Sequence, residues 1–201
     1  MKVDMGSPAL IACVMFLSGC TLFTPLNIDT KKNMLSNIPL DLPSERTHPA
    51  TLLVLVPETI PAYATTQMAY STQTYQIEYF AKNVWAETPS QMIQPLIVQT
   101  LRNTHYFSDI LSPPYFAGCT FGLRIEILEL KQDFTSEPAM VRLTMRISLS
   151  RNATNQVVAT KELSVNQPMS EKTPYAGVVA ANEAMPRLLR ELAEFVVEKA
   201  D

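Results

Sequence analysis

The stretch VRLTMRISLS, residues 141–150, decides the fold because it carries the most regular hydrophobic pattern in the chain. Its odd positions are apolar and its even positions are polar: Val141, Leu143, Met145, Ile147 and Leu149 against Arg142, Thr144, Arg146 and Ser148. Side chains of a β-strand alternate between two faces, so this pattern predicts a strand with one buried face. The other face is expected to be exposed to solvent or to contact a polar surface.

The segments on either side repeat the pattern. Residues 121–127 are apolar at odd positions, and the phase changes at Leu128, which predicts a β-bulge near 127–128. RNATN, residues 151–155, has the composition of a turn. The odd phase then returns with Lys161 as an exception: Val157, Ala159, Leu163 and Val165. Together these segments predict a three-stranded meander.

Shorter strands are expected earlier in the chain. TLLVLV, residues 51–56, is a continuous apolar run that ends before Pro57, which is typical of a strand covered on both faces. Residues 68–70 and 74–80 alternate on either side of STQ and predict a hairpin in which Tyr75, Ile77 and Tyr79 share a face. A further short strand is expected near residues 107–111.

Two helices are expected. Thr88, Pro89 and Gln91 form a capping box that opens a helix ending near Asn103. A longer helix follows Thr173 and Pro174, and apolar residues line one face of it: Ala181, Met185, Leu188, Leu192 and Phe195. The predicted fold is therefore α+β, a two-layer sandwich with a mostly antiparallel sheet and two helices packed on one face. This single domain is expected to occupy residues 50–201.

The N-terminal residues have the layout of a secretory signal. The apolar segment that precedes LSGC, residues 17–20, is shorter than the roughly 20 residues that span a bilayer. Leu-Ser-Gly-Cys resembles the lipobox of bacterial lipoproteins, which implies cleavage of residues 1–19 and attachment of a diacylglycerol to Cys20. The alternative is an ordinary signal or buried helix in which Cys20 stands by chance.

A proline-containing tether is expected from residue 20 to residue 49. Residues 34–42 are apolar enough that they could instead pack on the domain. Thr21 follows the anchor where, in lipoproteins of the enterobacterial type, an Asp resembles an inner-membrane retention signal. Its absence indicates the outer membrane, with the domain facing the periplasm.

Composition argues against several functions. A net charge of −3 disfavours nucleic acid as a partner. After cleavage and acylation Cys119 is the remaining thiol; no internal disulfide can form, and we expect this thiol to be buried. His48 and His105 lack metal-ligand spacing, and a His105–Asp109 pair is typical of a surface. We therefore predict no catalytic, cofactor-binding or metal-binding residue, and Cys20 as the lipidation site.

Residues 68–110 resemble the ABC-type transport auxiliary lipoprotein family. The positions that carry the resemblance are Tyr70, Tyr79, Asn83, Trp85, Ala86, Pro89, Leu101 and Phe107. The resemblance extends over roughly residues 50–197, and it departs from the family at Ser71, where many relatives carry a basic residue.

The resemblance implies a non-catalytic docking component of an MCE-type (mammalian cell entry) ABC transport system for phospholipids or similar apolar molecules. The implied partner is an MCE-domain protein, and the outer membrane is contacted through Cys20. An accessory lipoprotein of outer-membrane protein or lipopolysaccharide assembly would show the same anchor and a similar fold, and it is the alternative. A periplasmic enzyme that uses His105 is a more distant one.

Overall fold

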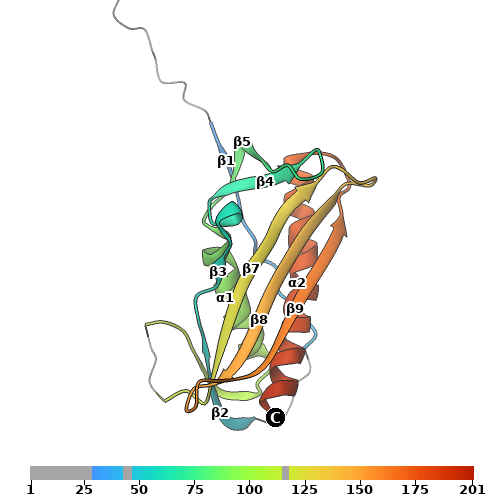
Figure 1. Cartoon of the computed structure of the whole chain (residues 1–201). Helices are drawn as coiled ribbons and strands as arrows, with labels where there is room; N and C mark the ends of the chain where they lie inside the picture. The colour runs from blue at the N-terminus through green and yellow to red at the C-terminus, as the bar shows by residue number, and fades with distance from the viewer. Residues whose placement is uncertain (1–28, 43–46, 115–117) are drawn as a thin grey trace, which may run out of the picture.

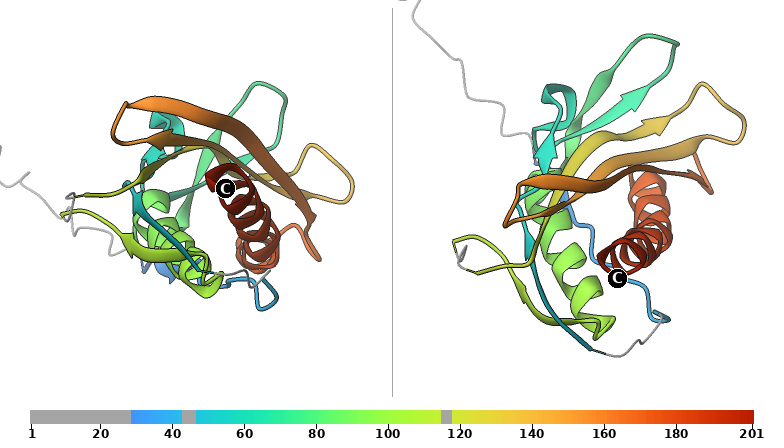
Figure 2. Two further views of the ribbon diagram at one scale, coloured as in Figure 1. Left: turned by 90° about the horizontal axis from the view of Figure 1, so that it is seen from below. Right: turned by 60° about the horizontal axis from the view of Figure 1, so that its bottom comes forward.

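The computed structural model describes residues 29–42, 47–114 and 118–201, which form one nine-stranded sheet and two α-helices (Figure 1). The elements are β1 (Lys31–Asn33), β2 (His48–Val54), β3 (Glu58–Thr59), the 3₁₀ turn η2 (Pro61–Tyr63), β4 (Gln67–Ser71), β5 (Glu78–Trp85), α1 (Pro89–Asn103), β6 (Phe107–Leu111), β7 (Phe121–Asp133), β8 (Met140–Arg151), β9 (Gln156–Pro168) and α2 (Pro174–Ala200). The sheet curls into a half-barrel, and both helices lie on its concave face (Figure 2). Neither described helix is long and apolar enough to cross a membrane.

The predicted meander is confirmed. β8 lies between β7 and β9 and pairs antiparallel with both, so that Ile147 stands opposite Ile125 on one side and Lys161 on the other. The register slips between Ile127 and Glu129, which is the predicted bulge. The odd-numbered apolar side chains of β8 are at most 1% exposed. They form the inner face of the sheet, against which α2 packs.

The other edge of β7 holds three short strands that follow one another along it. β2, β3 and β4 all run parallel to β7, with Leu52 opposite Phe121, Glu58 opposite Glu126 and Ala69 opposite Lys131. β1 with β5 and β2 with β6 are also parallel pairs. The sheet is therefore mixed and curled, and the simple two-layer sandwich with a mostly antiparallel sheet is not confirmed. Alternation shows which face of a strand is buried, but not which strand lies beside it.

Both predicted helices begin directly after their predicted N-cap residues. Thr88 and Gln91 make the reciprocal capping box of α1, and the Thr173 hydroxyl accepts a hydrogen bond from the Ala176 N–H at the start of α2. The predicted apolar stripe of α2 is buried. Trp85, the last residue of β5, is also in the core, at 5% exposed.

The hairpin differs from its prediction at the second strand. β4 and β5 pair antiparallel, but β5 begins only at Glu78. Tyr75, with a positive φ of 66°, and Ile77 both lie in the connection before β5, so of the three residues predicted to share a face only Tyr79 is in the strand. Alternation of apolar and polar residues does not show where a strand ends, because the residues of an adjoining turn can continue the same alternation by chance.

The folded unit begins before residue 50. β1 adds a parallel strand to β5, and Leu35 is 3% exposed within the core. Asn182 of α2 fixes this segment because its side chain accepts a hydrogen bond from the Ser36 N–H and donates one to the Met34 carbonyl. Part of the expected tether therefore packs on the domain, which is the alternative considered for residues 34–42.

Candidate functional site

The residues singled out from the sequence do not form one site in the described part of the chain. Cys20 lies outside the described residues. Cys119 is buried, as predicted, and burial followed by the charge of Asp109 raises the pKa of its thiol. His105 and Asp109 share no hydrogen bond or ion pair in the described structure; the Asp109 carboxylate instead accepts from the Ile110 N–H. His48 stacks on Tyr106 at 4.5 Å between ring centroids.

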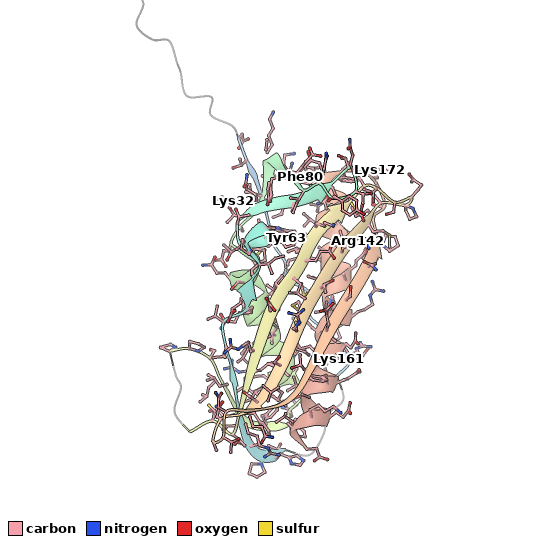
Figure 3. The ribbon with its side chains drawn as sticks, in the orientation of Figure 1. Lys32, Tyr63, Phe80, Arg142, Lys161 and Lys172 are labelled. Carbon is pink, nitrogen blue, oxygen red and sulfur yellow. The ribbon has the colours of Figure 1, made fainter. Side chains whose placement is uncertain are left out.

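The outer face of the meander carries the even-numbered polar residues of β8 and their neighbours. The Arg146 guanidinium lies 2.8 Å from a Glu126 carboxylate oxygen and 3.2 Å from one of Glu162, so it joins all three strands. Hydroxyl pairs, among them Ser148 with Thr160, continue the row. Figure 3 looks onto this face, with Arg142 towards its upper end. The face is thus a network of hydrogen bonds and ion pairs between neighbouring strands.

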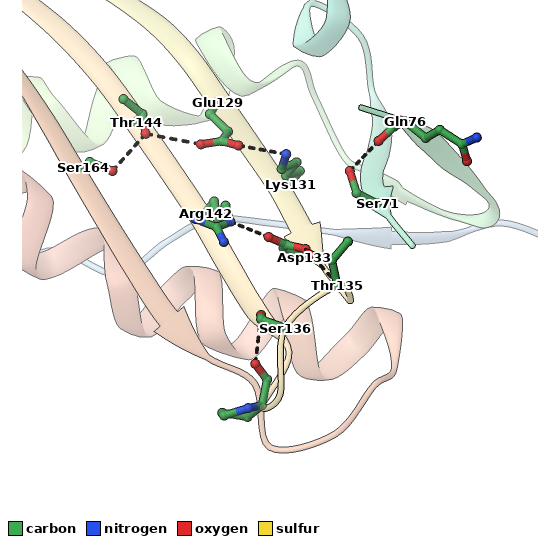
Figure 4. Close-up of polar contacts among 11 residues, drawn as sticks. Ser71, Gln76, Glu129, Lys131, Asp133, Thr135, Ser136, Arg142, Thr144 and Ser164 are labelled. Carbon is green, nitrogen blue, oxygen red and sulfur yellow. Dashed lines mark hydrogen bonds and ion pairs between the residues drawn. The ribbon is translucent and has the colours of Figure 1, made fainter. Parts of the chain in front are cut away.

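A pocket of about 580 Å³ opens on this face where β7 ends and β8 begins. We call it the hairpin pocket, and its lining residues are Tyr63, Ser71, Gln73, Thr74, Tyr75, Gln76, Ile77, Glu129, Lys131, Asp133, Thr135 and Arg142. The sheet supplies its charged residues, and the connection between β4 and β5 supplies its rim. A bond of 2.7 Å from the Ser71 hydroxyl to the Gln76 carbonyl holds that connection (Figure 4).

Asp133 is the most tightly held charge in the hairpin pocket. Its side chain is 6% exposed and accepts from Arg142 Nε at 2.5 Å, and from both the N–H and the hydroxyl of Thr135. Burial opposes ionisation, but the Thr135 hydrogen bonds and the Arg142 charge outweigh it, so the pKa of Asp133 lies below its ordinary value. The carboxylate is therefore ionised at neutral pH and holds Arg142 in place.

The second pair in the pocket is Lys131 with Glu129, whose charged atoms lie 3.0 Å apart. Burial, and then the charge of Glu129, raises the pKa of Tyr63 to about 12, so its phenol stays protonated. Each charged side chain thus has an opposite charge beside it, and no pair of a nucleophile and its base lines the pocket among the described residues. These groups can form hydrogen bonds to a polar surface while each charged side chain keeps its oppositely charged neighbour.

The alternation in β8 predicts its polar face, but no local pattern in the sequence predicts the pocket. The rim, from the connection between β4 and β5, and the charged floor, from β7 and β8, lie more than fifty residues apart in the sequence. They meet only because β4 pairs in parallel with the end of β7. Tyr75, in this rim, has a positive φ of 66°. In the sequence, the rim shows only as the polar residues of STQ and TYQ, which favour a hairpin and do not predict a pocket.

Solved structures share this fold at low sequence identity. A protein of Xanthomonas campestris, described as a member of family DUF330, superposes with a TM-score of 0.74 at 15% identity, covering 84% of this chain and 94% of its own. A second, uncharacterized protein gives 0.65 at 13% identity, with 83% and 99% covered. A hypothetical protein of Chlamydia trachomatis gives 0.52 at 12% identity, with 76% and 98% covered. No curated protein matches the chain.

The family comparison is more informative. The model of the ABC-type transport auxiliary lipoprotein component matches residues 35–193, most of the chain and nearly the whole described domain. The match begins at Leu35, the first core residue of the N-terminal segment, which agrees with a folded unit that starts before residue 50. The chain therefore belongs to the family of ABC-type transport auxiliary lipoprotein components.

Proposed function

We propose that this protein is a non-catalytic docking component of an MCE-type ABC transport system, anchored in the outer membrane and facing the periplasm. The observation that carries the proposal is the family match over residues 35–193, since the family is an auxiliary component of ABC transport. In this proposal the partner is an MCE-domain protein, and the cargo is a phospholipid or a similar apolar molecule that crosses between the two membranes.

The anchor in this proposal is Cys20. It follows Leu-Ser-Gly after a short apolar segment, and a thiol at this position is the group to which a lipid can be attached. Acylated Cys20 would become the first residue of the mature chain. Only the segment before Asp29 would separate it from the described domain.

We propose that the outer face of the meander and the hairpin pocket contact the partner. The inner face is closed by the helices, whereas the outer face leaves Arg146 and Glu162 partly exposed, with side chains 45% and 53% accessible. Protein interfaces that form and separate are commonly polar and hydrated, and paired charges at the rim give orientation more than affinity. Such a surface suits a component that positions a larger assembly.

A pull-down from envelope extract tests the proposal. The mature chain, extracted in mild detergent, would be captured by a C-terminal tag, and the bound proteins would be identified by mass. Recovery of an MCE-domain protein is expected. Recovery of a β-barrel protein without any MCE-domain protein would instead support the accessory role in outer-membrane assembly, and the transport proposal would be abandoned.

A further inference from the structure

One end of the domain gathers the start of the described chain and three connections. We call it the anchor end, and it comprises residues 29–32, 72–77, 134–139 and 169–175. β4, β7 and β9 finish here, and β5, β8 and α2 begin here (Figure 1). Figure 3 shows Lys32 and Lys172 at this end of the molecule. The turn between β8 and β9 lies at the opposite end.

The length of chain before Asp29 limits how far this end can lie from a lipid attached to Cys20. The nine residue steps from Cys20 to Asp29 reach at most roughly 32 Å even when fully extended. The strands of the meander are about 40 Å long at 3.3 Å per residue. The attachment therefore favours orientations in which the anchor end, and not the far end, is beside the membrane.

The anchor end also exposes aromatic and aliphatic side chains that the fold does not use. Tyr75 is fully exposed at the tip of the hairpin, Tyr175 is 69% exposed in the first turn of α2, and Ile77 is 39% exposed. Tyrosine is enriched at the level of lipid headgroups, because its ring is apolar and its hydroxyl stays hydrated. Tyr75 and Ile77 come from the connection between β4 and β5, and Tyr175 comes from the start of α2, so two separate segments expose apolar side chains at this end.

Charge at this end neither attracts nor repels an anionic surface. The basic residues are Lys31, Lys32 and Lys172, and the acidic ones are Asp29, Glu137 and Glu171. Lys172 is already paired with Glu137 at 2.6 Å. Contact with a bilayer would therefore depend on the exposed apolar groups and would be insensitive to salt.

We infer that the anchor end rests on the headgroup layer of the bilayer, with Tyr75, Ile77 and Tyr175 in contact with lipid. The strands of the meander then extend away from the membrane, and the outer face stands roughly perpendicular to the membrane plane. This inference rests on the acylation of Cys20 that the proposed function includes. Tyr75 and Ile77 also line the hairpin pocket, so this surface adjoins the proposed partner face at that pocket, and it has its own test.

The test uses the full acylated protein bound to phosphatidylcholine vesicles. A fluorophore is placed at position 75 through Tyr75→Cys, or at the far end through Val157→Cys, both in a Cys119→Ala background. Val157 is the matched control because it too is a largely exposed apolar residue, at 58%. Lipids with a spin label on the headgroup quench a fluorophore only when it lies near that layer.

We expect quenching at position 75 to be at least about twice that at position 157, as for a group held at the interface. Quenching at position 75 should not change when the salt concentration is raised. The substitution Tyr175→Ser should reduce quenching at position 75. Equal, weak quenching at both positions while the protein stays on the vesicles would overturn the inference alone. If the wild-type protein carries no lipid on Cys20 and does not bind vesicles, the anchor proposal fails, and the inference falls with it.

Discussion

The two faces of β8 differ although they are made by alternate residues of one strand. On the inner face, Ile147 is fully buried and belongs to the hydrophobic core. On the outer face, its neighbour Ser148 bonds to Thr160, and Arg146 bridges three strands. The inner face supplies apolar burial, which is the main favourable term in folding. The outer face contributes mainly hydrogen bonds and ion pairs between strands.

Functional groups can be placed on the outer face of this fold without disturbing the core. A strand with one buried face has a second face that is free to present polar groups in a fixed register. In this chain that second face includes the hairpin pocket. Substitutions one residue apart on β8 are therefore expected to affect different properties.

The largest effect is expected from the inner face. Ile147→Ala should lower the free energy of unfolding by about 2–5 kcal/mol, because it removes buried apolar groups and leaves a cavity. Ser148→Ala, one position along, should change it by less than about 1 kcal/mol, since it breaks one exposed hydrogen bond. Urea denaturation of the two variants measures both values. Equal decreases in the free energy of unfolding for the two variants would contradict the proposed difference between the two faces.

Asp133 is the exception on the outer face, and we expect Asp133→Asn to cost about 2 kcal/mol at neutral pH, as for hydrogen bonds to a charged group. Its pKa is lowered in the folded state, so the unfolded chain binds the proton more readily. The stabilisation is therefore complete above the ordinary pKa of aspartate and is lost as the pH falls below about 4. Unfolding of both proteins at a series of pH values should show the difference shrinking in acid. A difference that stays constant across this range would rule out this role for the carboxylate.

Gln132 is the polar exception on the inner face. A Cβ added at Gly177 would lie 2.0 Å from the Gln132 side chain, which also donates to the Pro174 carbonyl at 3.0 Å. Gly177→Ala should therefore destabilise the protein by about 1–2 kcal/mol, because overpacking outweighs the better helix propensity of alanine. Thermal unfolding measures the change. A more stable variant would mean that Gln132 can move aside freely.

The smallest effect on stability is expected at Arg146. Arg146→Ala should cost less than about 1 kcal/mol, because its ion pairs are partly exposed and screened by salt. The same substitution should weaken capture of the partner, if the outer face is the contact surface. Lys161→Ala is the matched control, since Lys161 pairs with Glu191 at 2.9 Å and is similarly exposed. Equal capture by both variants would place the contact elsewhere.

Local patterns predicted most of the elements of this fold. Alternation identified the meander, the phase change identified the bulge, and Thr88 with Gln91 identified the start of α1. The parallel placement of β2, β3 and β4 along β7 was missed, since it depends on contacts between distant segments that no local pattern encodes. The hairpin pocket was missed for the same reason. Its rim and floor are brought together only by that long-range pairing.

The most direct test of the central claim, that a polar face built on this scaffold docks a transport partner, is a quantitative pull-down with the acylated protein. Wild type, Arg146→Ala and Lys161→Ala would be captured in equal amounts, and the bound MCE-domain protein would be measured. We expect wild type and Lys161→Ala to recover it equally, and Arg146→Ala to recover less. Failure of the wild-type protein to recover any MCE-domain protein, with a β-barrel recovered in its place, would contradict the account.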